Sequence, residues 1–109
     1  MLKGNADTLL LALSEKEAMY GYQIVKEVDE RSSGYFAFKE GTLYPELHRL
    51  EKAKLVDGRW KDTPNNVRRR YYLITVKGQL ALMDRLSEWQ RFINAMDSIM
   101  RPGTSPEAQ

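Results

Sequence analysis

"GTLYPELHRL", residues 41–50, decides the fold, because its leucines stand four and three residues apart. At about 100° per residue, Leu43, Leu47 and Leu50 fall on one narrow stripe, which predicts a helix that packs this stripe against a core. Thr42 is expected to cap the helix. Pro45 is tolerated in the first turn, where a proline's missing N–H has no partner within the helix. The helix therefore presents its other face to solvent from its first turn.

That other face is polar and basic. Both glutamates of the helix, Glu46 and Glu51, stand beside the leucine stripe rather than opposite it. Cations and hydrogen-bond donors suit phosphates and base edges, whereas a face that docks another protein would tolerate acids. The face therefore favours DNA, and its members are Tyr44, Pro45, His48, Arg49 and Lys52.

Two helices are expected before this one. Residues 5–13 carry a leucine stripe, residues 14–18 are polar and predict a connection, and residues 20–31 keep helical spacing from Gly21 to Val28. Gly34 is expected to end the second helix in the left-handed conformation. Phe36 and Phe38 alternate in a short extended segment, which predicts that both point inward.

After the central helix the sequence predicts a hairpin. Extended residues 58–61, turn residues 63–66 and β-forming residues 68–75 follow one another. Alternation places Tyr72 and Ile74 on one face, and Trp60 and Tyr72 are expected to pack the hairpin on the core. Three helices and a hairpin predict a mainly helical α+β fold, a winged helix-turn-helix over residues 1–75. The third helix is then the reading helix and the hairpin the wing.

The wing concentrates positive charge. Residues 58–77 carry six basic residues and one acid, a net charge of +5, whereas the rest of the chain sums to −3. Such a segment indicates a local anionic partner. The alternative is a solvated turn that its arginines keep soluble.

A long helix is expected over residues 76–100, capped by Thr75. At 1.5 Å per residue it is about 37 Å long, more than one small domain covers. Its heptad-like apolar seam therefore predicts a homodimer. Residues 101–109 stop the helix and predict a disordered tail. The residues of the seam are Leu82, Leu86, Trp89, Ile93, Met96 and Met100.

Other classes of protein are disfavoured by composition. The 109-residue chain has no cysteine and one histidine, His48. This leaves no metal-ligand set, no cofactor site and no nucleophile–base arrangement, so we expect neither a metalloprotein nor an enzyme. The longest apolar run, residues 9–13, is too short to span a membrane, and the first residues do not resemble a signal peptide. We expect a cytoplasmic protein without membrane contacts.

Several short motifs follow one another in a specific order and spacing. They are Leu2-Lys3-Gly4, Tyr20-Gly21-Tyr22-Gln23-Ile24, Gly41-Thr42-Leu43-Tyr44-Pro45, Leu47, Arg49-Leu50-Glu51, Arg69-Arg70-Tyr71-Tyr72, and Thr75 with Gly78. In these motifs the chain resembles the PadR-like family of transcriptional regulators, in its short form with a single C-terminal helix. The resemblance runs from about residue 2 to 98. Leu73 departs from the family pattern, which more often has a polar residue there.

The resemblance implies a homodimer whose last helices pack around a two-fold axis. It also implies reading helices in successive major grooves of a roughly palindromic double-stranded DNA operator, usually for repression. Some members bind flat aromatic effectors beside a tryptophan of the last helix, and Trp89 occupies the matching place. Met96, further along the seam, is expected to line the same slot because thioether side chains repack at low cost. The expected DNA-binding residues are Tyr22, Lys39, Thr42, Tyr44, Pro45, His48, Arg49, Lys52, Arg68, Arg69 and Arg70.

Several of these residues have a second interpretation. Tyr44 could pack beneath the wing, Arg49 could pair with a neighbouring glutamate, Tyr22 could rest on the core, and His48 could fill solvent-facing surface. Trp89 and its symmetry mate could close the dimer core instead of holding a ligand. For the whole chain, the alternative function is a winged-helix module that docks another protein without binding DNA.

Overall fold

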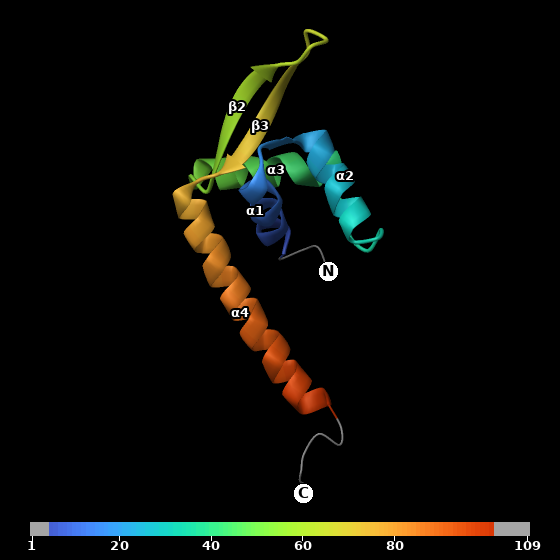
Figure 1. Ribbon diagram of the computed structural model, residues 1–109, viewed down its shortest axis with the longest axis vertical. Coiled ribbons are helices and arrows are strands. Elements are labelled where there is room, and N and C mark those ends of the chain that lie inside the picture. Colours follow the sequence, from blue (N-terminus) through green and yellow to red (C-terminus); the bar gives the residue numbers. More distant parts are fainter. Residues whose placement is uncertain (1–4, 102–109) are drawn as a thin grey trace, which may run out of the picture.

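The leucine stripe of residues 41–50 lies at the centre of the core in the computed structural model, which describes residues 5–101. Leu43, Leu47 and Leu50 are at most 3 % exposed, and their helix crosses the base of a long hairpin (Figure 1). The predicted winged helix-turn-helix, mainly helical with a small sheet, is confirmed. The elements in order are α1 (Ala6–Lys16), β1 (Met19–Tyr20), α2 (Gly21–Arg31), α3 (Glu40–Lys52), β2 (Val56–Asp62), β3 (Arg68–Ile74) and α4 (Val76–Met100).

The sheet has one more strand than predicted. β1 pairs antiparallel with β3 on the side away from β2, so the strand order is β1-β3-β2. A strand of two residues is too short to show an alternating pattern, which is why β1 is absent from the sequence prediction. β2 pairs with β3 in a register that sets Val56 opposite Ile74 and Gly58 opposite Tyr72.

The core takes one face from each helix and the inner face of the hairpin. Tyr72 is 2 % exposed, which confirms its predicted packing against the core. Phe38 is buried and Phe36 is half-buried against the same cluster, so both point inward as expected. The other buried members of the cluster are Ala6, Leu10, Leu11, Leu13, Met19, Ile24, Val28, Leu43, Leu47, Leu50, Val56, Ile74 and Leu82.

The end of α1 differs from the prediction. Residues 14–18 were expected to form a connection, but α1 continues to Lys16. Ser14 is buried, and its hydroxyl donates a hydrogen bond of 2.9 Å to the Leu10 carbonyl. A serine that satisfies its hydroxyl within its own helix can stay in a buried turn, so polarity alone misplaced this boundary.

The start of α3 also differs. Lys39 is the N-cap, and its carbonyl accepts the N–H groups of Thr42 and Leu43. Thr42 is therefore the third helical residue, not the cap, and Pro45 lies in the second turn. Pro45 supplies no N–H for the Gly41 carbonyl. Gly41 and Pro45 are both exposed, so water can donate the missing hydrogen bond to the Gly41 carbonyl.

The first turns of α4 are fastened to the domain. The Thr75 hydroxyl accepts the Gly78 N–H at 3.0 Å, which confirms the predicted cap. The same hydroxyl donates to the Lys54 carbonyl at 2.7 Å. Two turns later, Arg85 forms an ion pair of 3.2 Å with Asp7 of α1. The root of α4 is thus bound both to the loop before β2 and to α1.

The rest of α4 projects away from the domain (Figure 1), which gives the molecule extents of 67 × 29 × 22 Å. No helix within residues 5–101 has both the length and the apolarity to cross a membrane. Residues 2–4 of the family-like motifs and residues 102–109 of the predicted disordered tail lie outside the described residues.

Candidate nucleic-acid interface

The face of α3 opposite the core is open to solvent, as predicted. Tyr44 is 40 % exposed, so it is not packed away beneath the wing. The acids Glu46 and Glu51 are half-buried at the edges of the leucine stripe. The remaining predicted contacts on or beside α3 are all exposed, namely Lys39, Thr42, Pro45, His48, Arg49 and Lys52.

The Tyr44 ring lies against the start of α2, where Gly21 has no side chain. A Cβ atom at Gly21 would lie 2.7 Å from Cζ of Tyr44 and closer still to its hydroxyl oxygen. Only a glycine leaves room for the ring at this distance. Tyr22, the next residue, is 62 % exposed and does not rest on the core. Tyr22 of α2 and Tyr44 of α3 therefore both reach the surface between the two helices.

A cleft of about 460 Å³ lies between α3, the start of α2 and the hairpin. It brings together six of the eleven residues predicted to contact DNA. Five others, Lys39, Thr42, Pro45, Arg49 and Lys52, do not line it. The six that do are Tyr22, Tyr44, His48, Arg68, Arg69 and Arg70.

Trp60 also lines this cleft, and its predicted packing into the core is wrong. It is 57 % exposed. Its side chain shares a strand face with Val56, but Val56 is the only buried residue of β2, and the outer part of the hairpin extends beyond the helices (Figure 1). The guanidinium groups of Arg68 and Arg70 lie 5.4 Å from the indole instead. Trp60 therefore supports wing arginines rather than the core.

The arginines of the site differ in their partners. Arg49 pairs with Glu46 one turn before it, the structural alternative raised for this residue, and remains 63 % exposed. Arg68 lies 3.6 Å from Asp62, with both side chains well exposed. Arg69 stacks at 4.2 Å on the Tyr20 ring and forms no ion pair with any described residue. Arg69 is thus the wing arginine whose charge is least compensated.

Arg70 is only partly open to solvent. It pairs with Glu51 of α3, and the two side chains are 28 % and 29 % exposed. Its guanidinium also lies 6.0 Å from the Tyr72 ring, and burial raises the pKa of Tyr72 against the opposing effect of Arg70. Arg70 therefore faces the protein as much as the cleft.

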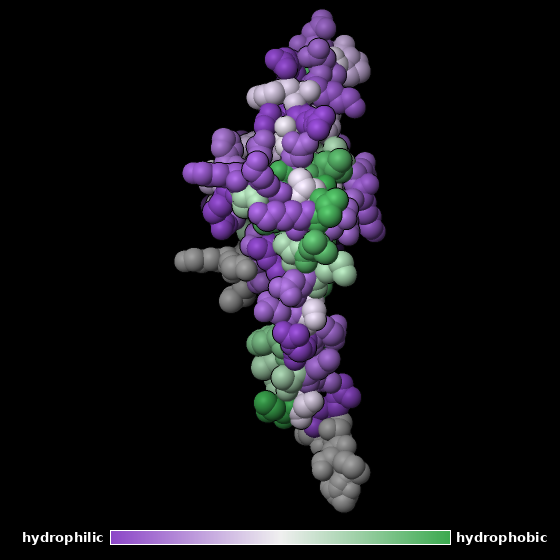
Figure 2. Space-filling model, turned by 90° about the vertical axis from the view of Figure 1, so that its left-hand side faces the viewer, coloured by the Kyte–Doolittle hydropathy of each residue, from purple (hydrophilic) through white to green (hydrophobic). Residues whose placement is uncertain are grey.

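Apolar side chains gather over the projecting part of α4 (Figure 2). Trp89 is 56 %, Phe92 61 % and Ile99 82 % exposed. Leu86, Met96 and Met100 of the predicted seam are also exposed, and Ile93 is half-buried. Leu82, the first residue of the predicted seam, is 2 % exposed and packs in the core of its own chain. It has no surface left for a partner, which corrects that part of the predicted interface.

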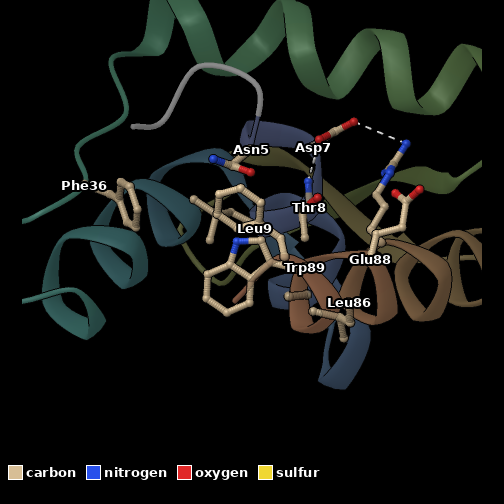
Figure 3. Close-up of a pocket in the computed structure, with 11 residues that line it drawn as sticks. Asn5, Asp7, Thr8, Leu9, Phe36, Leu86, Glu88 and Trp89 are labelled. Carbon is tan, nitrogen blue, oxygen red and sulfur yellow. Dashed lines mark hydrogen bonds and ion pairs between the residues drawn. The ribbon is translucent and has the colours of Figure 1, made fainter. Parts of the chain in front are cut away.

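A second hollow, of about 600 Å³, lies where α4 leaves the domain. Figure 3 shows Trp89, Leu86 and Phe36 around it, with the dashed Asp7 ion pair at its edge. Met96, expected to share a ligand site with Trp89, does not line this pocket. The side facing away from the domain is formed by the apolar surface of α4.

Comparisons with known proteins agree with this architecture. Residues 9–84 match the model of the transcriptional regulator PadR-like family. A curated Lysinibacillus sphaericus protein, described as uncharacterized, is 32 % identical over 100 residues, 92 % of each chain. A PadR family transcription regulator from Clostridium difficile R20291 is 33 % identical, with a TM-score of 0.80 over 89 % of this chain and 99 % of that one. Bacillus subtilis PadR, solved in complex with operator DNA, is 23 % identical, with a TM-score of 0.70 over 79 % of this chain and 48 % of its own, a likeness of fold.

Proposed function

Because the chain belongs to the PadR-like family of transcriptional regulators, we propose that it binds an inverted-repeat operator in double-stranded DNA as a homodimer and represses transcription there. The observation that carries this proposal is the cleft between α3 and the wing, which gathers donors and cations from three elements. A helix fits the major groove, and the neighbouring wing reaches the phosphate backbone. The fold shared with Bacillus subtilis PadR, which was solved with its operator, supports this docking.

The two walls of the cleft have different roles in this proposal. His48 and Arg49 are exposed on α3. With this helix in the major groove, their side chains would meet base edges. Arg68 and Arg69 lie at the base of the hairpin turn and suit phosphates, which position the protein without specifying sequence. Tyr22 and Tyr44 line the same cleft, and their hydroxyl groups can donate hydrogen bonds to the DNA backbone.

The dimer is proposed from the apolar surface of α4. Leu86, Trp89 and Phe92 are about half exposed or more, and apolar area left in water costs about 25 cal/mol per Å². A two-fold partner that packs on this surface makes a self-complementary interface. Two α3 helices related by that axis read half-sites about one duplex turn apart, which requires an inverted repeat.

Selection from a pool of random 40-base-pair duplexes tests the function. We expect the wild-type protein to enrich an inverted repeat, and its affinity to fall steeply with KCl because bound phosphates release counterions. Arg69→Ala is expected to lower the salt slope by about 0.9 for each phosphate that the variant no longer neutralises, and to weaken selected and random duplexes alike. A pool that stays unenriched would exclude sequence-specific binding.

His48→Ala separates recognition of bases from recognition of phosphates. We expect it to relax the sequence preference of one position in each half-site, at about 1–3 kcal/mol for the base-edge hydrogen bonds it removes, while the salt slope stays at its wild-type value. Repeating the selection with the variant measures this. An unchanged selected sequence would mean that His48 only fills the surface. The alternative function, docking of another protein, is disfavoured because the exposed face of α3 carries no acid opposite its core stripe.

A planar aromatic effector is a second element of the proposal, and the pocket at Trp89 favours it. Aromatic and aliphatic groups form much of the lining of this pocket, which suits stacking of a flat molecule, and polar side chains complete it: Asn5, Asp7, Thr8, Arg85 and Glu88. Nη1 of Arg85, in the wall, is buried and has no hydrogen-bond partner among the described residues. We therefore propose an aromatic compound that carries an acidic group, whose binding changes the spacing of the reading helices.

Tryptophan fluorescence tests this site. Because Trp60 also emits, planar aromatic acids and their neutral amides are titrated into Trp60→Phe and into Trp89→Ala. We expect the acids to quench Trp60→Phe, the amides to do so more weakly, and neither to change Trp89→Ala. Bound acid is also expected to weaken operator binding. If no compound gives a Trp89-dependent signal, Trp89 serves only as dimer core.

A further inference from the structure

The ion pair between Arg70 and Glu51 joins the wing to the reading helix. The two residues are 19 positions apart, one in β3 and the other near the end of α3. Within residues 5–101 no other ion pair connects α3 to the hairpin. Its side chains are each less than one-third exposed, whereas Arg68 and Asp62 at the hairpin turn are 65 % and 81 % exposed. The pair is therefore a cross-link between two DNA-binding elements rather than a surface pair.

Gly58 provides the space for this cross-link. A Cβ atom on Gly58 would lie 2.9 Å from Nε and Nη2 of Arg70 and 2.9 Å from Oε2 of Glu51. In the register of the hairpin, Gly58 lies opposite Tyr72 and Trp60 lies opposite Arg70. The guanidinium is 5.4 Å from the Trp60 ring and 6.0 Å from the Tyr72 ring. Both rings and the bare glycine backbone thus hold the Arg70 side chain toward Glu51.

We propose that Arg70 and Glu51, seated on Gly58, are positioning residues that set the angle of the wing relative to α3. This assignment rests on the proposed DNA-binding function and changes the role expected for Arg70, which is not primarily a phosphate ligand. Arg69 and Arg68 remain the phosphate ligands. The angle between α3 and the wing decides whether α3 can reach base edges while the wing reaches the DNA backbone.

The positioning role predicts an effect opposite in sign to simple electrostatics. Glu51→Ala removes a negative charge beside DNA and frees Arg70, so charge alone would tighten binding. Loss of the cross-link instead weakens it. Gly58→Ala keeps every charge and displaces only the flexible ends of two side chains, so it breaks the pair without removing a group that meets DNA.

The test measures fluorescence anisotropy on the duplex that the wild type selects, over a series of KCl concentrations. Glu51→Ala, Gly58→Ala and Arg70→Ala are each expected to bind about tenfold more weakly, within the range of coupled ion-pair networks, with the wild-type salt slope. Glu46→Ala is the matched control. It also removes one negative charge from α3, but the ion pair that it breaks, with Arg49, lies within that helix and does not reach the wing. It is expected to bind no more weakly than wild type.

A second measurement does not depend on DNA. Residual dipolar couplings of backbone amides in α3 and the hairpin report the angle between them, which is expected to change in Gly58→Ala and not in Glu46→Ala. Tighter or unchanged binding by Glu51→Ala overturns the positioning role, as does a salt slope reduced in Arg70→Ala by about 0.9 for each of the two Arg70 side chains in the dimer. If the wild type selects no duplex, the proposed function fails, and an unchanged angle in Gly58→Ala then overturns the positioning role separately.

Discussion

Leu86→Asp is expected to convert the protein into a monomer and to lower its affinity for the selected duplex by roughly a thousandfold. Leu86 is 48 % exposed on the apolar surface of α4. In a two-fold interface each substitution occurs twice, so two unpaired carboxylates would be buried. A monomer also loses the second half-site, and linked sites gain about 10²–10⁴-fold in affinity from being held together.

Light scattering at micromolar concentration and anisotropy with the selected duplex measure both effects. Asn94→Asp is the matched control, because it adds one negative charge to the same exposed stretch of α4 on a side chain that already bonds to its neighbour Gln90. It is expected to remain dimeric. Circular dichroism checks that Leu86→Asp keeps its helices. A Leu86→Asp protein that stays dimeric and bound to DNA would show that α4 is not the dimer interface.

Gly78→Ala is expected to lower the free energy of unfolding by about 3 kcal/mol, the upper end of the usual range for overpacked sites. A Cβ atom there would lie 2.7 Å from Cγ1 of Ile74, 3.0 Å from the Leu55 carbonyl carbon and closer still to its oxygen. Backbone atoms cannot rotate away as a side chain can. The clash must therefore shift α4 away from Leu55 and disturb the Thr75 cap.

Urea unfolding of Gly78→Ala and Gly41→Ala makes the comparison. Gly41 also lies in a helix, but a Cβ atom there would have nothing within 4 Å. Alanine at Gly41 is therefore expected to stabilise the protein by about 0.5–1 kcal/mol, the usual difference between the two residues in a helix. Equal stability of the two variants would contradict the tight packing at Gly78.

Patterns that repeat along the chain predicted most of the fold. The spacing of Leu43, Leu47 and Leu50 identified the buried side of α3, and the alternation of Tyr72 and Ile74 identified the inner face of β3. Both patterns depend only on the period of the backbone and on which side meets the core. The extent of α4 was predicted for the same reason, because its cap at Thr75 and its long apolar seam are local signals.

Features that depend on the meeting of distant segments were not predicted. β1 forms because Met19 and Tyr20 lie beside β3. Trp60 is exposed because the hairpin extends beyond the core. The partner of Arg70 lies in another element, so an arginine whose sequence context indicates a phosphate ligand is an ion-pair residue in the structure. The space required at Gly21 and Gly58 likewise follows from side chains far along the chain.

The strand order β1-β3-β2 leaves one long edge of the sheet unpaired, that of β2. Unpaired N–H and C=O groups on such an edge can form hydrogen bonds with the edge strand of another copy of the protein, which can begin β-aggregation. Four of the seven residues of β2 are charged and exposed, Asp57, Arg59, Lys61 and Asp62. Their hydration opposes stacking, as in natural sheets that avoid fibre growth. The same wing that is proposed to meet DNA is thereby protected from aggregation while no DNA is bound.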